Sequence, residues 1–433
     1  MIRPSHALIM TVGLLGGQGD DVLAALQLDL DALEPDFLGL IASGQSGPNA
    51  RRMVERCALP PEQCEIVVLN SAHDLDEVFR ETNALIRRLI ERGYRPDQIA
   101  VNYTSGTKVM GSGAVLAAVS SKLMELRYVK GLASVREGPA DARHRLLTTQ
   151  PAAVMAYQDL LSGWAMLRDL RYRSAVTTLQ GSAEKLLSPD EDALRRKLIV
   201  LSRAYACWDA FHPEKFLELY GMLEFDSEWL MPFRLTEGPL DRIRELARER
   251  QGGQPGPCII TDMFNNAVRR LHLDRAEDAL TRLYRALEML AQWVLWRDFG
   301  IDTNQVDTRR IPPRDRVAFE AMRSMEDGLV KIGLRKAFDL LSILNTRVGR
   351  HIGEDPVMKD FLGRQGQSIL AHGLHPADSG AARRFLCHAR RLFGVEIEGF
   401  EALAEQMQFP WLQVRDVESS EHAAISEGPG DED

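Results

Sequence analysis

Residues 99–123 read IAVNYTSGTKVMGSGAVLAAVSSKL. The stretch begins with a short apolar run, Ile99–Tyr103, passes through a turn of small and hydroxylated residues, and continues into a segment rich in Gly, Ala and Ser. Near-continuous apolar runs are typical of strands that are buried on both faces, whereas the following segment has the length and pattern of a helix. This stretch therefore predicts a strand, a turn and a helix that belong to an α/β sheet.

The same alternation extends to both sides of this stretch. Further apolar runs are expected to be strands at Ala7–Val12, Phe37–Ala42, Ile66–Leu69 and Leu126–Val129. Amphipathic segments separate them; in one, Leu75, Val78, Phe79, Thr82, Ile86 and Leu89 share a helical face, and Gly93 favours a helix end. Alternating strands and helices imply crossover connections, so residues 1–150 are predicted to form a Rossmann-like, doubly wound, mainly parallel α/β domain.

From about Pro151 the pattern is helical and carries no strand signal. We expect a helical connecting region at 151–248, a linker rich in Gly, Pro and Gln at 249–258, an all-α helical domain at 259–413 and a disordered acidic tail at 414–433. Within the helical domain, a stripe expected to face the core is formed by Ala279, Leu283, Leu287, Leu290 and Val294.

Composition narrows the classes of function. The chain has 433 residues, of which 45% are hydrophobic and 27% charged, as in globular proteins of two or three domains. A net charge of −9 argues against a protein that coats DNA or membranes, although a helix N-terminus still suffices to bind an anion. The five cysteines form no CxxC pair, and we see neither a signal peptide nor a membrane span. We therefore expect a cytoplasmic protein without a metal or a cofactor.

The turn in the middle of residues 99–123 predicts a ligand site. The first amides of a helix are unpaired and lie at the positive end of its dipole, so they attract anions. Thr104, Ser105 and Thr107 add hydroxyl groups, Gly106 permits close approach of the backbone, and Lys108 adds a positive charge. These groups predict a site for phosphate or another anion, and it lies at the carboxyl end of a strand, where doubly wound sheets bind ligands. The alternative is a turn that only caps the helix beside a solvated lysine.

Two other junctions are expected to line the same crevice. Gly13 follows the first strand, in a glycine-rich turn, and Ser43 follows the second. These residues lie at the carboxyl ends of their strands, although the glycines can equally serve only the turn. His73 follows the third strand, where an exposed loop histidine is the simpler interpretation.

A known signature resembles the turn. Asn102, Thr104, Gly106, Thr107, Lys108 and Met110 are similar to the Asn/Asp-x-Thr-Gly-Gly-Thr-Lys-x-Met pattern of CARF domains, the CRISPR-associated Rossmann-fold sensors, with Ser105 in place of the first glycine. The resemblance implies a homodimer that binds a cyclic oligoadenylate across its two-fold axis. It implies ligand contacts from Gly13, Ser43, Asn102, Thr104, Ser105, Gly106, Thr107 and Lys108.

The C-terminal half extends this resemblance. Asn266, Arg269, Arg270, Ala279 and the segment 282–288 are similar to the first helices of the effector domain in one CARF subfamily. Residues 368–373, SILAHG, resemble the active-site segment of HEPN domains, which are metal-independent ribonucleases of type III CRISPR systems. The resemblance implies a single-stranded RNA substrate, with His372 and an arginine as the catalytic residues.

The arginine departs from the family pattern. Four to six residues separate the arginine from the histidine in HEPN domains, which places the arginine between Gln365 and Gln367, whereas the nearest arginine is Arg364, with seven residues between it and His372. We take Arg364 and His372 as the catalytic pair. One alternative is that the nuclease activity is weakened or lost. Another is a sensor whose helical half only regulates, or whose CARF-like half degrades its own ligand. An enzyme of phosphorylated metabolites is a third alternative.

Two other arginine–histidine pairs occur in the helical domain. Arg383 and His388 have the family spacing, but His388 lies on the packed face of an amphipathic helix, where a structural role is the simpler interpretation. Arg347 and His351 are one residue too close together.

Overall fold

The computed structural model describes residues 6–14, 19–130, 145–181, 186–364 and 378–412. Contacts within the chain divide it into two compact units. One comprises Met1–Leu161 and Gly181–Asp192, and the other comprises Ser162–Gln180 and Ala193–Asp433. The tail predicted at 414–433 lies outside the described residues, and the domain boundaries drawn from the sequence remain predictions.

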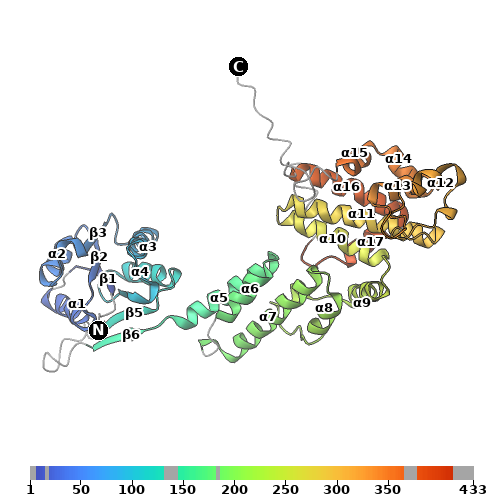
Figure 1. Cartoon of the computed structure of the whole chain (residues 1–433). Helices are drawn as coiled ribbons and strands as arrows, with labels where there is room; N and C mark the ends of the chain where they lie inside the picture. Colours follow the sequence, from blue (N-terminus) through green and yellow to red (C-terminus); the bar gives the residue numbers. More distant parts are fainter. Residues whose placement is uncertain (1–5, 15–18, 131–144, 182–185, 365–377, 413–433) are drawn as a thin grey trace, which may run out of the picture. The chain divides into compact units, whose positions relative to one another are not determined.

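A six-stranded sheet forms the centre of the first unit (Figure 1). Its strands are β1 Ala7–Val12, β2 Phe37–Ser43, β3 Cys64–Leu69, β4 Ile99–Asn102, β5 Glu125–Lys130 and β6 Arg145–Thr149. The order across the sheet is β3-β2-β1-β4-β5-β6, and β6 alone among these strands runs antiparallel to its neighbour. This arrangement confirms the predicted doubly wound, mainly parallel sheet.

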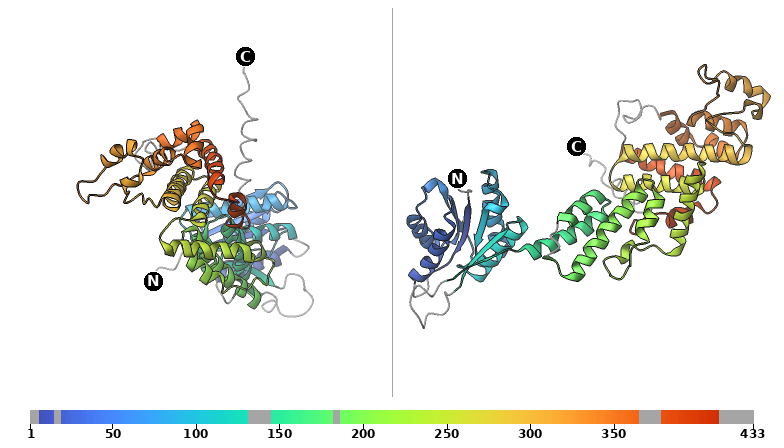
Figure 2. Two further views of the ribbon diagram at one scale, coloured as in Figure 1. Left: turned by 90° about the vertical axis from the view of Figure 1, so that its right-hand side faces the viewer. Right: turned by 60° about the horizontal axis from the view of Figure 1, so that its bottom comes forward.

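Helices cover both faces of this sheet (Figure 2). They are α1 Gly19–Leu33, α2 Gly47–Arg56, α3 Leu75–Glu91 and α4 Lys108–Ser120, with 3-10 turns η1 Pro61–Gln63 and η2 Pro96–Gln98. Apolar residues of α1 and α2 pack with Leu8 and Leu38 on one face, and those of α3 and α4 pack with Ile9 and Val101 on the other. Because β1 and β4 are buried on both sides, their sequences are continuously apolar.

Two details of the first unit differ from the sequence pattern. Strand β6 was not predicted, because RLLTT is an edge strand with only two apolar residues and is mostly exposed. Leu75, expected on the buried face of α3, is 41% exposed, since it is the first residue of the helix after the N-cap Asp74. Gly93 adopts a φ of +99° just after α3, which agrees with its predicted role at the helix end.

The second unit is helical. Its elements are α6 Tyr172–Gly181, α7 Pro189–Asp209, α8 Pro213–Tyr220, η5 Met231–Phe233, α9 Glu237–Gly252, α10 Pro257–His272, α11 Ala276–Phe299, η6 Thr308–Arg310, α12 Pro313–Glu320, α13 Leu334–Ile343, α14 Arg347–Glu354, α15 Pro356–Arg364, α16 Ser379–Glu396 and α17 Phe400–Gln406. Helix α5, Ala152–Arg168, spans the division between the units, and the first residues of α7 belong to the first unit. Helices α10 and α11 pack side by side, with α16 against them (Figure 1).

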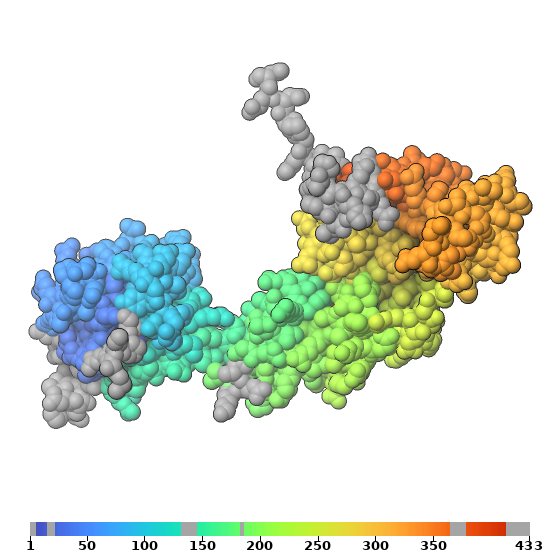
Figure 3. Space-filling model, in the orientation of Figure 1, coloured from blue at the N-terminus to red at the C-terminus, as the bar shows by residue number. Residues whose placement is uncertain are grey.

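The core of the second unit confirms the predicted stripe on α11. Ala279, Leu283, Leu287, Leu290 and Val294 are all fully buried. In contrast, α12 and the segment after it lie at the surface (Figure 3), where Val317 is 77% exposed and Met325 is completely exposed. Among the described helices, none is both long enough and apolar enough to cross a membrane.

The segment 249–258, predicted as a linker, is mostly helical. Helix α9 continues to Gly252, α10 begins at Pro257, and Gly253 ends α9 with a φ of +70°. The reason is Glu249, whose carboxylate accepts hydrogen bonds from the backbone amides of Cys258 (3.2 Å) and Ile259 (2.8 Å) at the start of α10. This contact fixes a short turn between the two helices.

Candidate functional site

Three loops meet at the carboxyl ends of β1, β2 and β4. The hydroxyl of Ser46, after β2, donates to the carbonyl of Val12 at the end of β1 (2.7 Å). The amide of Gly13, after β1, donates to Oγ of Ser105, after β4 (3.0 Å). The hydroxyl of Thr11 donates to the carbonyl of Ser105 (2.5 Å). The structure thus brings together the three junctions that the sequence places around one crevice, while their part in binding remains a prediction.

Gly13 is fixed by close contact with the loop after β4. A Cβ at this position would lie 2.5 Å from the nitrogen and 2.7 Å from the Cα of Gly106. Gly106 itself adopts a φ of +94°, which a side chain disfavours. Both glycines are therefore needed for the two backbones to approach each other.

Most hydroxyl groups predicted to contact the ligand have partners in the protein. Thr107 is the N-cap of α4: its Oγ1 accepts from the amide of Met110 (3.1 Å) and donates to the carbonyl of Ala72 (2.6 Å). Oγ1 of Thr104 accepts from the amide of Val129 (2.8 Å). Oγ of Ser105 accepts from Gly13, and that of Ser43 lies 3.1 Å from the hydroxyl of Ser46. Among the described residues, the hydroxyl groups of Thr104 and Ser105 donate no hydrogen bond, whereas Thr107 donates its proton to Ala72.

Asn102 is fully buried at the end of β4. Its Nδ2 donates to Asp29 of α1 (2.5 Å), and its Oδ1 accepts from the amide of Thr104 (2.8 Å). The same carboxylate accepts from Nε of Arg127 (2.5 Å). Asn102 therefore holds the turn from inside the protein, and its complete burial keeps its side chain away from a ligand.

The groups left for an anion lie at the N-terminus of α4. Within the described part of the chain, the backbone amides of Gly106, Lys108 and Val109 have no hydrogen-bond partner. Lys108 is exposed, and its ammonium group has no partner among these residues. Amides, helix dipole and ammonium therefore all favour negatively charged oxygen at this point.

The predicted catalytic pair lies at the edge of the described residues. His372 and the whole segment 365–377 fall outside them, and for Arg364 only the backbone, at the end of α15, is described. Helices α15 and α16 flank the segment, and Asp378 caps α16 by accepting from the amide of Ala381 (2.7 Å). The pair of Arg364 and His372 stays a prediction.

The alternative histidine, His388, has a structural partner. Its Nδ1 lies 2.7 Å from Oδ2 of Asp355, whose other oxygen accepts from the amides of Val357 and Met358 at the start of α15. Burial alone would raise the pKa of Asp355, but the hydrogen bonds from His388 and from these amides hold it below its ordinary value. This geometry supports the structural interpretation of His388.

A buried polar cluster holds α10 against α7. Asp209 of α7 accepts from Nε of Arg269 (2.8 Å), from Arg270 and from Nδ2 of Asn266 (2.9 Å). Arg269 is fully buried and also donates to Asp262 (3.2 Å), whose pKa is raised by burial despite this partner. The sequence resemblance identified the arginines but not the aspartates. The available signal was the arginine itself, because a buried guanidinium requires a carboxylate.

One family model and two solved structures are similar to this chain. Residues 248–392 match the family model of the Csm6 HEPN domain. No curated protein matches the chain. A structure of Enterococcus italicus Csm6 bound to cyclic hexa-2'-fluoro-hexa-dAMP has 13% identity and a TM-score of 0.45, with 97% of this chain and 98% of that chain covered. A type III CRISPR defence DNA nuclease activated by cyclic oligoadenylate has 14% identity and a TM-score of 0.25, with 49% and 35% covered.

The chain thus joins a Rossmann-like domain to a helical segment, residues 248–392, that matches the Csm6 HEPN domain.

Proposed function

We propose that a cyclic oligoadenylate binds the CARF-like domain and activates a metal-independent, single-strand-specific HEPN endoribonuclease in the same chain. The observation that carries this proposal is the N-terminus of α4, where free amides and the exposed Lys108 converge, together with the Csm6 HEPN match of residues 248–392. A phosphate of the cyclic ligand suits the first feature, and RNA cleavage suits the second.

The ligand is expected to lie on the two-fold axis of a homodimer. A ring of adenylates repeats the same phosphate group, so two copies of the α4 cradle are able to hold one ring. Thr104 and Ser105 belong to the turn that precedes Lys108, and Gly13 is bonded to this turn through Ser105. We place the protein in the cytoplasm, where such a signal and RNA meet.

The chemistry of the HEPN domain requires no metal. The 2′-oxygen of one nucleotide attacks the adjacent phosphorus, the bond to the 5′-oxygen of the next nucleotide breaks, and a cyclic phosphate forms. His372 is proposed to transfer a proton in this step, because its pKa range suits proton transfer near neutrality. Arg364 is proposed to stabilise charge on the phosphate.

The decisive experiment measures RNA cleavage by the full chain, in EDTA, with and without each cyclic oligoadenylate. We expect cleavage only with one of these ligands, and His372→Ala should abolish it. His272→Ala is the matched control, because His272 is an exposed histidine at the end of α10 and should leave cleavage unchanged.

Two results would redirect the proposal. Tight ligand binding without RNA turnover would identify a sensor with an inactive effector, which the seven-residue spacing of Arg364 and His372 keeps open. Loss of the ligand itself during incubation would identify a CARF-like domain that degrades its activator.

A further inference from the structure

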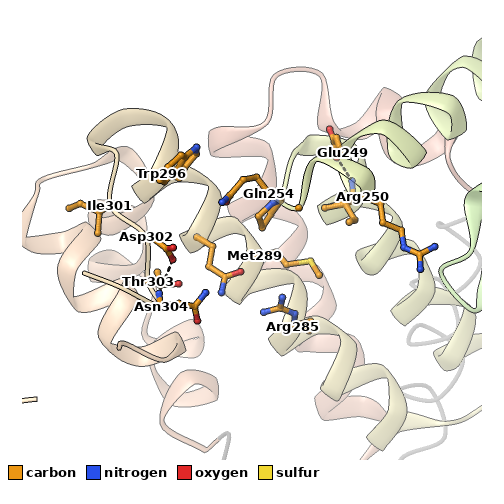
Figure 4. Close-up of a pocket in the computed structure, with 14 residues that line it drawn as sticks. Glu249, Arg250, Gln254, Arg285, Met289, Trp296, Ile301, Asp302, Thr303 and Asn304 are labelled. Atoms are coloured by element: carbon orange, nitrogen blue, oxygen red, sulfur yellow. Dashed lines mark hydrogen bonds between the residues drawn. The ribbon is translucent and has the colours of Figure 1, made fainter. Parts of the chain in front are cut away.

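A small pocket opens on the second unit between the α9–α10 turn, α11 and the segment after α11 (Figure 4). Its volume is about 280 Å³. Pockets for drug-sized ligands begin at roughly 300 Å³, so this one is suited to a single small group.

One stripe of α11 forms a wall of the pocket. Arg285, Met289, Gln292 and Trp296 follow each other at spacings of four, three and four residues, which places them on one helical face. Met289 is 9% exposed and supplies an apolar floor, whereas Trp296 is 47% exposed and presents its indole to the opening. The exposed indole of Trp296 offers a flat surface for stacking.

The charged residues around the pocket are already paired. Glu249 accepts from two amides of α10, and Arg250 donates to Glu214 (2.9 Å). Arg285 donates to Glu288 (2.6 Å), and Asp302 accepts from the amide of Asn304 (2.8 Å). The two acidic and two basic groups also balance, so the pocket favours a neutral ligand group over a phosphate.

The uncharged polar side chains that line the pocket include three amides. Across the described ranges, the side chains of Gln254, Gln292 and Asn304 line the pocket and have no hydrogen-bond partner. Each carboxamide donates and accepts, which matches the edge of a nucleobase. A stacking ring together with adaptable amides is the usual way in which proteins recognise unstacked bases of single-stranded RNA.

We infer that this pocket binds one unstacked nucleobase of the RNA substrate, with the base stacked on Trp296 and its edge bonded to the three amides. The inference rests on the proposed ribonuclease function and adds a contact that selects for single-stranded RNA. The sugar and phosphate of the bound nucleotide stay outside the neutral pocket.

The test uses the full chain saturated with its activating cyclic oligoadenylate and a fluorescent single-stranded oligonucleotide in which every 2′-oxygen is methylated. Cleavage is blocked because the attacking hydroxyl is absent. Anisotropy should show that Trp296→Ala weakens binding by about 5- to 100-fold, the range expected for loss of one stacked base. Trp296→Phe keeps a ring and should stay within about threefold of the wild type.

Two controls isolate the base. Met325→Ala alters another exposed apolar side chain in the same unit and should bind normally. An oligonucleotide without bases should bind the wild type and Trp296→Ala equally, because only the base reaches the pocket.

Equal affinity of the wild type and Trp296→Ala for the methylated RNA would overturn the inference. So would a weaker affinity of Trp296→Ala than of the wild type for the baseless strand or for the cyclic oligoadenylate. A failure of the proposed function gives a different result: the wild-type chain would not cleave unmodified RNA.

Discussion

Lys108 is the first side chain of α4 and stands where the unpaired amides of that helix point outward. A positive group at this position adds to the helix dipole, so both act on the same anion. The hydroxyl of Thr107 caps the helix at the same time, which keeps the amides in place.

Charge reversal at Lys108 should therefore weaken binding of the cyclic oligoadenylate. We expect Lys108→Glu to lower affinity by at least about tenfold, since a hydrogen bond to a charged group contributes roughly 1.5–3 kcal/mol. Isothermal titration calorimetry measures this change. Arg87→Glu is the matched control. Arg87 is exposed near the C-terminal end of α3, which lies away from the carboxyl ends of the strands. Unchanged affinity in Lys108→Glu would remove the lysine from the site.

The close packing around Gly13 predicts that a side chain at this position lowers both stability and ligand binding. In Gly13→Ala the new methyl group would meet the backbone of Gly106, so either β1 or the turn before α4 must shift. We expect a loss of about 1–3 kcal/mol in the free energy of unfolding and weaker ligand binding. Gly44→Ala, after β2 with no atom within 4 Å of its added Cβ, should change neither quantity. Urea unfolding of the two variants makes the comparison.

The residue types of the candidate site were predictable from the sequence, but their tasks were not. The order of apolar runs indicated which junctions meet. The sequence pattern did not indicate that Asn102 donates a hydrogen bond to Asp29, or that Thr107 donates one to Ala72. Each acceptor belongs to a distant segment of the chain. Long-range partners of short polar side chains depend on packing, which local patterns do not encode.

Among the helices, α10 is the one whose polar groups are most deeply buried. Arg269 packs over the ring of Phe409 (4.3 Å from its centroid to the guanidinium carbon) and meets Asp209 and Asp262. A guanidinium in such surroundings is stable only while its carboxylates remain.

Removal of Asp209 should therefore destabilise the second unit strongly. We expect Asp209→Ala to cost about 3–5 kcal/mol of unfolding free energy, because Arg269 and Arg270 would lose their shared acceptor. Differential scanning calorimetry should show a lower transition temperature for this unit. The control Asp241→Ala breaks an exposed pair with Arg244 and should have little effect. Equal behaviour of the two variants would contradict the role assigned to Asp209.

The contact of Asp355 with α15 and His388 predicts that the stability of the fold depends on pH. Because its pKa is lower in the folded chain than in the unfolded chain, Asp355 stabilises the fold above the unfolded value of about 4 and loses this effect as the pH falls through its folded pKa. The stability difference between the wild type and Asp355→Asn should thus shrink between pH 5.5 and pH 3.5. Urea unfolding at both pH values tests this. Glu326→Gln, at an exposed site, should show no such trend.

Secondary structure followed the sequence where the pattern was strong. Strands buried on both faces and the apolar stripe of α11 stood out, because burial forces a regular spacing. Strand β6 and the helical course of 249–252 did not, since the first is an exposed edge strand and the second contains Gln and Gly, which are typical of a linker. Where the local sequence pattern was weak, tertiary contacts determined the secondary structure.

For the whole chain, the proposed homodimer makes a stoichiometric prediction. If one cyclic ligand lies across two α4 cradles, calorimetric titration should give one ligand for two chains, and light scattering should give a dimer before and after addition. A ratio of one ligand per chain would contradict a shared site. In the Lys108→Glu variant the dimer should persist, because the exposed lysine is assigned to the ligand and not to the fold.

Helix α11 carries two stripes at once: Leu283, Leu287, Leu290 and Val294 face the core, and Arg285, Met289, Gln292 and Trp296 line the pocket. An α-helix turns by about 100° per residue, so insertion or deletion of a single residue near its middle would rotate one half of both stripes out of phase. A single substitution along α11 therefore alters one contact at a time, whereas a change in the length of the helix between Leu283 and Trp296 alters both stripes at once.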